Sequence, residues 1–194
     1  DDVILGGNAD TFAIGGTGLD IVTTGSGQDS ILGDHGRITY NFDGTLLRAE
    51  SLHLDQGNVD TIIAGDGDNL VIAGFAGDSV TSGSGKDTII GDNGIINQNT
   101  SGVITDAFTI SLDIGGKDVI SAGHGDNTIF GGFESDLITS LSGNDIITGD
   151  NGIAIFTSGH LTTLDSTDLD DSTGAADNIS AGDGQNKIIA GAGT

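Results

Sequence analysis

The segment Ala73–Gly94, AGFAGDSVTSGSGKDTIIGDNG, returns with few changes at Gly131–Gly152 as GGFESDLITSLSGNDIITGDNG, after a period of about 58 residues. A weaker copy stands at Gly15–Gly36. Internal repetition at this period is typical of a solenoid, whose function is distributed over its units instead of held in one catalytic centre. We therefore predict a single solenoid fragment over residues 1–194, with long repeats at about 1–58, 59–116, 117–175 and a partial 176–194.

Each long repeat contains a shorter period of nine residues. Its first half is rich in glycine, its sixth position is Asp or Asn (Thr11 in one copy), and its last three residues are centred on an apolar side chain. Glycine reaches backbone conformations that are closed to other residues, which predicts a turn, and the β-branched second half predicts a short strand. The clearest copies are Gly15–Thr23, Thr24–Leu32, Ala64–Ile72, Ala73–Thr81, Ser82–Ile90, Ala122–Phe130, Gly131–Thr139, Ser140–Thr148 and Ala181–Ile189.

Position eight of the nonapeptide is aliphatic in every copy, as expected for one inward side chain per short strand. Two strands and two turns would make one coil of about 18 residues, and each strand would pair with its equivalent in the next coil. The residues at position eight are Ile4, Ala13, Val22, Ile31, Ile62, Val71, Val80, Ile89, Ile120, Ile129, Ile138, Ile147, Ile179 and Ile188.

The composition fits a thin and very acidic solenoid. The chain has 35 Gly, only seven Phe and one Tyr, and no Trp, Pro, Cys or Met, so a thick core and disulfides are excluded. It carries 29 acidic and 5 basic residues, a formal net charge of -24, and all the acids except Glu50 and Glu134 are Asp. Such a chain repels itself when compact unless cations bind; a solvated or halophilic surface is the alternative. We expect no nucleic acid partner and no direct membrane insertion, for want of basic patches and long apolar runs.

The nonapeptides resemble the RTX (repeats-in-toxin, hemolysin-type) family, whose repeat GGxGxDxUx has an apolar residue at U. The resemblance implies an all-β, right-handed parallel β-roll or β-helix solenoid. It also implies that position six and the carbonyls of the glycine turn bind several Ca2+ ions between successive coils. Carried over by position, the implied metal ligands are Asp2, Asp20, Asp29, Asp60, Asn69, Asp78, Asp87, Asp118, Asn127, Asp136, Asp145, Asp177 and Asn186.

Turns alternate between the two edges of a roll, which divides these residues into two columns. One edge should stack Asp60 with Asp78 and Asp118 with Asp136, and the other Asn69 with Asp87 and Asn127 with Asp145. We predict stronger calcium sites on the all-Asp edge and weaker or neutral-ligand sites on the other. For a single Asp the alternative is an Asx turn that satisfies its own backbone, whereas a column at constant spacing favours Ca2+.

A second sequence pattern interrupts the nonapeptides. The tetrapeptide GDHG or GDNG occurs at Gly33–Gly36, Gly91–Gly94 and Gly149–Gly152, and about 22 residues with a central glycine follow each copy. Their alternating pattern predicts inserted β-hairpins or widened coils. The outward apolar residues Ile14, Ile72, Phe130 and Ile189 would then be covered by the hairpins or form a contact face for a neighbouring chain. Near the end of each insert an Asp either extends a metal site or caps a turn: Asp55, Asp113 and Asp170.

The leading hypothesis is a calcium-binding structural segment of a large secreted or cell-surface bacterial protein. The resemblance implies type I secretion and folding outside the cell when Ca2+ binds. One alternative is a self-assembling adhesin stalk, surface layer or filament, with neighbouring copies or cell-surface material as partners. Another is the C-terminal secretion or stabilising part of a secreted hydrolase. We expect no enzyme, because the chain has no HExxH motif and its four His residues do not recur at matched positions.

Overall fold

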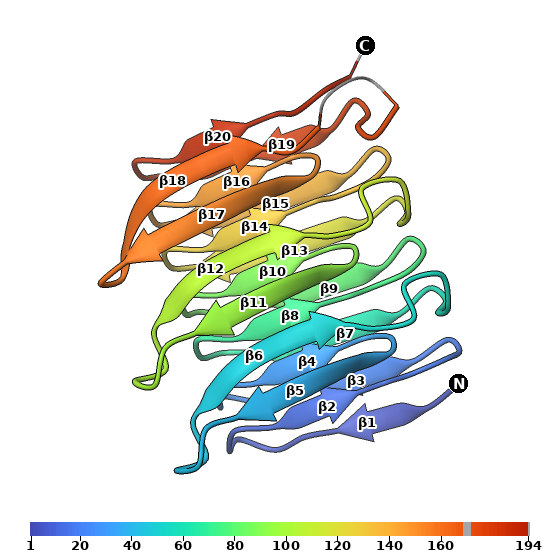
Figure 1. Ribbon diagram of the computed structural model, residues 1–194, viewed down its shortest axis with the longest axis vertical. Helices are drawn as coiled ribbons and strands as arrows, with labels where there is room; N and C mark the ends of the chain where they lie inside the picture. The colour runs from blue at the N-terminus through green and yellow to red at the C-terminus, as the bar shows by residue number, and fades with distance from the viewer. Residues whose placement is uncertain (169–171, 194) are drawn as a thin grey trace.

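Short strands follow the glycine-rich turns, and each pairs with the equivalent strand of the next coil. The computed structural model describes residues 1–168 and 172–193, and over them the strands form three sheets (Figure 1). Two of the sheets are parallel and make up the roll, and the third is antiparallel and lies against one of them. No helix in the described residues has the length and apolar character needed to cross a bilayer.

The two parallel sheets take alternate strands along the chain. The first sheet contains, in spatial order, β1 (Val3–Leu5), β3 (Ile21–Thr23), β7 (Thr61–Gly65), β9 (Ser79–Ser82), β13 (Val119–His124), β15 (Leu137–Ser142) and β19 (Asn178–Ser180). The second sheet contains β2 (Phe12–Ile14), β4 (Ser30–Leu32), β8 (Leu70–Ile72), β10 (Thr88–Ile90), β14 (Thr128–Phe130), β16 (Ile146–Thr148) and β20 (Lys187–Ile189).

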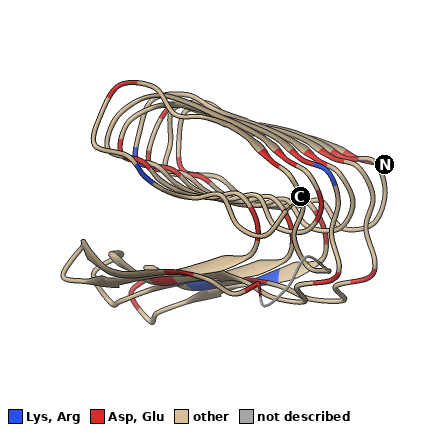
Figure 2. Cartoon of the chain, turned by 90° about the horizontal axis from the view of Figure 1, so that it is seen from above, with Lys and Arg blue, Asp and Glu red and all other residues tan. Residues whose placement is uncertain are grey.

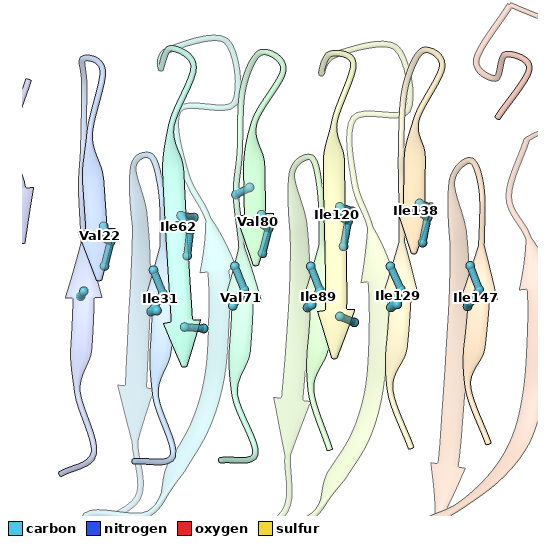
Figure 3. Close-up of a cluster of buried hydrophobic side chains, with 14 residues drawn as sticks. Val22, Ile31, Ile62, Val71, Val80, Ile89, Ile120, Ile129, Ile138 and Ile147 are labelled. Atoms are coloured by element: carbon cyan, nitrogen blue, oxygen red, sulfur yellow. The ribbon is translucent and has the colours of Figure 1, made fainter. Parts of the chain in front are cut away.

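The position-eight column forms the core between these two sheets. Val22 pairs with Ile62 in the first sheet and Ile31 with Val71 in the second, so equivalent side chains stack from coil to coil (Figure 3). From Ala13 to Ile147 the column is buried, as predicted. In the end coils, Ile4 and Ile179 are half-buried and Ile188 is 47% exposed. The structure thus confirms an all-β, parallel β-roll built on the nonapeptide.

The inserts are β-hairpins, and the hairpins pair with one another into a third sheet, the hairpin sheet. Its strands are β5 (Gly36–Tyr40), β6 (Leu46–Ser51), β11 (Gly94–Gln98), β12 (Ile104–Thr109), β17 (Gly152–Thr157) and β18 (His160–Ser166). Ile96, Ala107 and Ala154 pack with Ile72 and Phe130 of the second sheet in a second core. The outward apolar column is therefore covered by the hairpins at Ile72 and Phe130.

Each hairpin interrupts a nonapeptide within its turn, between positions one and six. In the uninterrupted repeat at 131–139, a Cβ added to Gly131 at position one would lie 2.3 Å from Oδ2 of Asp136 at position six. Across the second hairpin, a Cβ added to Gly91 would lie 2.1 Å from Oδ2 of Asp118. Gly91 and Asp118 thus hold positions one and six of a single turn, although the hairpin separates them in sequence.

Candidate metal site

The position-six residues form two columns, one at each edge of the roll. The turns that lead into the first sheet form the all-Asp edge, with Asp2, Asp20, Asp60, Asp78, Asp118, Asp136 and Asp177. The turns that lead into the second sheet form the Asn-containing edge, with Thr11, Asp29, Asn69, Asp87, Asn127, Asp145 and Asn186. Figure 2 shows the acidic residues in the turns at both edges of the roll. The stacking predicted from the repeat is confirmed.

One side-chain oxygen of each position-six residue from Asp20 to Asn186 accepts a backbone N–H of the adjacent coil. On the all-Asp edge, Oδ1 of Asp78 accepts the backbone N–H of Asp60 at 2.7 Å, and Oδ1 of Asp118 accepts that of Asp78 at 2.6 Å. On the other edge, Oδ1 of Asp87 accepts the N–H of Asn69 at 3.0 Å. These bonds run to the neighbouring coil, so the Asx-turn alternative, in which the side chain serves its own turn, does not hold at these positions.

The other carboxylate oxygen has no hydrogen-bond partner along the all-Asp edge from Asp20 to Asp177. Oδ2 is buried without a hydrogen-bond partner in Asp20, Asp60, Asp78, Asp118, Asp136 and Asp177. Burial and the neighbouring carboxylates raise the pKa of Asp78 to about 9, and burial with nearby Asp177, Asp150 and Glu134 raises the pKa of Asp136 to about 8. A buried carboxylate oxygen without a donor is costly, and a proton or a cation must compensate it.

The structure adds three carboxylates to this edge that were not among the predicted ligands: Asp34, Asp92 and Asp150 at position two of the interrupted turns. Asp92 accepts the N–H of Gly116, where the chain returns from the hairpin, at 2.8 Å, and the N–H of Phe133 in the next turn. It therefore fastens the base of the hairpin to the following coil. The available signal was the Asp in GDHG and GDNG, at a position where the nonapeptide has glycine.

Asp34 and Asp150, the equivalents of Asp92, also accept backbone hydrogen bonds at the base of their hairpins. Asp34 accepts the N–H of Asn58 at 3.3 Å and of Phe75 at 2.5 Å, and Asp150 accepts that of Ala175 at 2.9 Å. Burial raises the pKa of Asp34 and of Asp150 to about 7, with further contributions from nearby carboxylates. These groups increase the negative charge that the all-Asp edge must hold.

Other acidic residues of the inserts differ from this buried set. Asp55 and Asp113 are exposed, and Asp170 lies outside the described residues. Position four has a positive φ at Ala76 (77°) and Glu134 (72°), a conformation that favours the consensus glycine. Glu134 keeps the turn geometry of the repeat at the cost of backbone strain.

Side chains alone do not build a metal cage here. In residues 1–168 and 172–193, no group of three or more His, Cys, Asp or Glu side chains could hold a metal ion. Any cation on this edge must therefore draw on backbone carbonyls as well, and glycine turns expose those. Gly16 and Gly18, with φ of 99° and 120°, show the left-handed conformations such a turn requires.

A hollow in the described surface lies on the hairpin side of the roll. It has a volume of about 220 Å³, lies between the Asn-containing edge and the hairpin tips, and is lined by Gln28, Asp68, Lys86 and Phe156 among others. Its described lining residues include no His, Cys or Ser that could act as a nucleophile or its base.

The comparison with protein families matches this arrangement. The family described as RTX calcium-binding nonapeptide repeat (4 copies) matches residues 5–37, 63–95, 115–138, 122–153 and 171–194, more than half of the chain. The chain belongs to this family. RTX nonapeptide repeats bind several Ca2+ ions across their repeats, and they are structural units, not catalytic ones. The comparisons with curated proteins and with solved structures returned no match.

The residues of this RTX chain fit calcium. Ca2+ is a hard cation that takes six to eight oxygen ligands from carboxylates and carbonyls. The all-Asp edge offers a row of buried carboxylate oxygens that lack a donor. They lie against the first glycine of their own turn at Asp20, Asp60, Asp118, Asp136 and Asp177. Added positive charge would offset both the desolvation and the mutual repulsion that raise the pKa values of these groups.

Proposed function

We propose that this chain is a calcium-dependent structural segment of a large secreted or cell-surface bacterial protein, with the all-Asp edge as its main metal-binding surface. The observation that carries the proposal is the row of buried Oδ2 atoms without partners on that edge. Asp20, Asp60, Asp78, Asp118, Asp136 and Asp177 would hold the ions together with carbonyls of the adjoining turns. Asp2 extends the same column at its exposed end.

The same edge explains why folding would follow calcium. Three-residue strands and a thin aliphatic core offset little chain entropy, and the buried carboxylates oppose coiling. A metal bound only by the folded chain adds its binding free energy to folding. RTX proteins are typically secreted by type I systems. A chain that stays unfolded at low cytosolic calcium and coils outside the cell suits that route.

The proposal is tested by circular dichroism and thermal unfolding in Ca2+, in EGTA and in Mg2+ with EGTA. We expect strand signal and a cooperative transition with a high Tm in Ca2+, and in EGTA a much lower Tm, with a fold that persists only in the cold and that Mg2+ does not stabilise. The double variant Asp118→Ala/Asp136→Ala should lose most of the calcium-induced rise in Tm. Asp165→Ala, an exposed acid on the hairpin sheet, should keep it. Equal Tm values in Ca2+ and EGTA for the native sequence would refute the proposal.

A second candidate is lateral assembly into a stalk, layer or filament. The outer face of the first sheet is not covered by the hairpin sheet (Figure 2) and exposes Val3, Leu5, Ile21, Val119 and Leu137. Positions seven and nine of its strands carry no charged side chain, in a chain of net charge -24. Light scattering in Ca2+ at rising protein concentration tests this. Growth in mass that Val119→Thr/Leu137→Thr abolishes would support assembly, and a constant monomer mass would exclude it.

A further inference from the structure

The Asn-containing edge is built with the same backbone bonds as the all-Asp edge. Asn69 Oδ1 accepts the N–H of Asp29 at 3.0 Å, and Asn127 Oδ1 accepts the N–H of Asp87 at 3.1 Å. Asn186 Oδ1 accepts the N–H of Asp145 at 3.0 Å. Because Oδ1 has the same role in Asp and Asn, the amide Nδ2 takes the place that Oδ2 has in an Asp.

The amide nitrogens donate hydrogen bonds from that place. Asn69 Nδ2 donates to the carbonyls of Gly67 at 3.0 Å and Gly65 at 3.3 Å, at positions four and two of its own turn. Asn127 Nδ2 donates to the carbonyl of Gly125 at 3.0 Å. The second side-chain atom of position six therefore faces carbonyl oxygens in these turns. An Asp oxygen in such surroundings needs a cation, whereas an amide supplies the positive end of its own N–H dipoles.

The same pattern recurs elsewhere on this edge. Asn186 Nδ2 donates to the carbonyl of Gly182 at 3.0 Å, and Asn127 Nδ2 also donates to Oδ1 of Asp145 at 3.2 Å. Asp145 Oδ2 accepts the hydroxyl of Ser140 at 2.8 Å. The amides and one hydroxyl thus satisfy oxygens that would otherwise be available to a metal.

We infer that Asn69, Asn127 and Asn186 are built-in substitutes for calcium, so that the Asn-containing edge closes without metal and the solenoid takes up ions on its all-Asp edge alone. This inference rests on the proposed function, and it assigns calcium binding to the turns of one edge. From Asp29 onward, each gap between coils on this edge includes one Asn turn. Oδ2 of Asp29 and of Asp87 is buried without a partner, but the flanking amides leave too few free oxygens for an ion that prefers six to eight.

Native mass spectrometry in Ca2+ tests the inference by counting ions in three proteins: the native sequence, Asn69→Asp/Asn127→Asp and the exposed control Asp165→Asn. We expect the double variant to bind more ions than the native sequence and the control to bind the same number. Should the double variant fail to fold, Asn127→Asp alone serves the same purpose. An unchanged ion count in the Asn→Asp variants, or a loss of ions in Asn69→Ala/Asn127→Ala, overturns the inference.

Hydrogen exchange in EGTA in the cold, where the metal-free fold persists, provides a readout without metal and separates this inference from the proposed function. We expect the amides of Asp29 and Asp87, which bond to Asn oxygens, to exchange more slowly than those of Asp60 and Asp118 on the all-Asp edge. The Asn→Asp variant should speed exchange at the Asn-containing edge at least about tenfold, because a buried donor is replaced by an unpaired acceptor. Equal exchange at the two edges overturns the inference. Failure of the native sequence to bind any Ca2+ overturns the proposed function instead.

Discussion

The backbone N–H of Asp118 donates to Oδ1 of Asp136 over 2.8 Å, and Oδ2 of both residues is buried without a hydrogen-bond partner. One oxygen of each carboxylate therefore joins two coils, while the other has no partner among the described residues. The two arginines do not change this balance, since their described ion pairs both involve Glu50 on the hairpin sheet. Stability of the all-Asp edge should follow the supply of positive charge.

Replacing one of these carboxylates by its amide should reduce the dependence on calcium. Asp136→Asn keeps the acceptor for Asp118 and removes a buried charge, so we expect the free energy of unfolding in EGTA to rise by about 1 kcal/mol. The stabilisation by added Ca2+ should shrink at the same time. Urea unfolding in the cold, in EGTA and in Ca2+, measures both, with Asp165→Asn as control. An equal loss of stability in both conditions would argue for a purely structural carboxylate.

Acid should stabilise the metal-free fold. Burial raises the pKa of Asp60 to about 6, of Asp136 to about 8 and of Asp78 to about 9, from an ordinary value of 3.8. Folding then takes up protons, so this contribution is fully present below about pH 4 and is lost as pH rises through about 6 to 9. Thermal unfolding in EGTA should give a higher Tm at pH 5 than at pH 8. A Tm that is equal at the two values, or higher at pH 8, contradicts this.

Loss of the Asp92 carboxylate should loosen the base of the second hairpin. Asp92→Ala leaves the buried N–H groups of Gly116 and Phe133 without an acceptor, which should cost about 2 kcal/mol or more in Ca2+. Exchange of these two amides should accelerate with the fall in stability. Asp113→Ala, an exposed acid of the same insert, should leave both unchanged. Unchanged protection of the Gly116 amide in Asp92→Ala would show that Asp92 does not hold the base of the hairpin.

Two substitutions in one turn should have opposite effects. Gly132 has φ of 119°, and a Cβ there would lie 2.2 Å from Oδ2 of Asp92, so Gly132→Ala should destabilise strongly. Glu134 has φ of 72°, so Glu134→Gly should raise the free energy of unfolding by about 1 kcal/mol. Urea unfolding in Ca2+ compares the two. The backbone account is wrong if both variants shift stability in the same direction.

The hairpin sheet should depend on Phe130. This side chain is fully buried between the second sheet and the hairpins, so Phe130→Ala should cost about 3–5 kcal/mol. Phe42, at the first hairpin tip, is fully exposed, and Phe42→Ala should change stability by less than about 0.5 kcal/mol. Thermal unfolding in Ca2+ provides the comparison, and a small effect at Phe130 would mean that the hairpins pack loosely on the roll.

The repeat made most of the fold predictable, because a fixed period forces equivalent residues into equivalent places. Position eight identified the inner core, and position six identified the two columns at the edges. The sequence could not distinguish inserted hairpins from a wider coil, because the alternating pattern of the inserts suits either. The pairing of one hairpin with the next is a long-range contact, for which the sequence has no local signal. For Ile72 and Phe130 the sequence left two alternatives, cover by the hairpins or contact with a neighbouring chain.

The candidate site was predictable in its spacing and less so in its membership. Asp34, Asp92 and Asp150 were recognisable as fixed punctuation, but only the structure shows that a hairpin divides one nonapeptide and brings position two beside position six. The sequence shows that position six alternates between Asp and Asn on one edge, but it does not show the different roles of the two residues. That the amide reaches the carbonyls of its own turn follows from the backbone geometry, which the sequence does not specify.

Anomalous diffraction from crystals grown in Ca2+ tests the central claim most directly. The account predicts a row of calcium peaks along the all-Asp edge, each between successive carboxylates from Asp20 to Asp177, and no peaks beside Asn69 or Asn127. An ordered roll whose Asp118 and Asp136 carboxylates have no ion between them would contradict it.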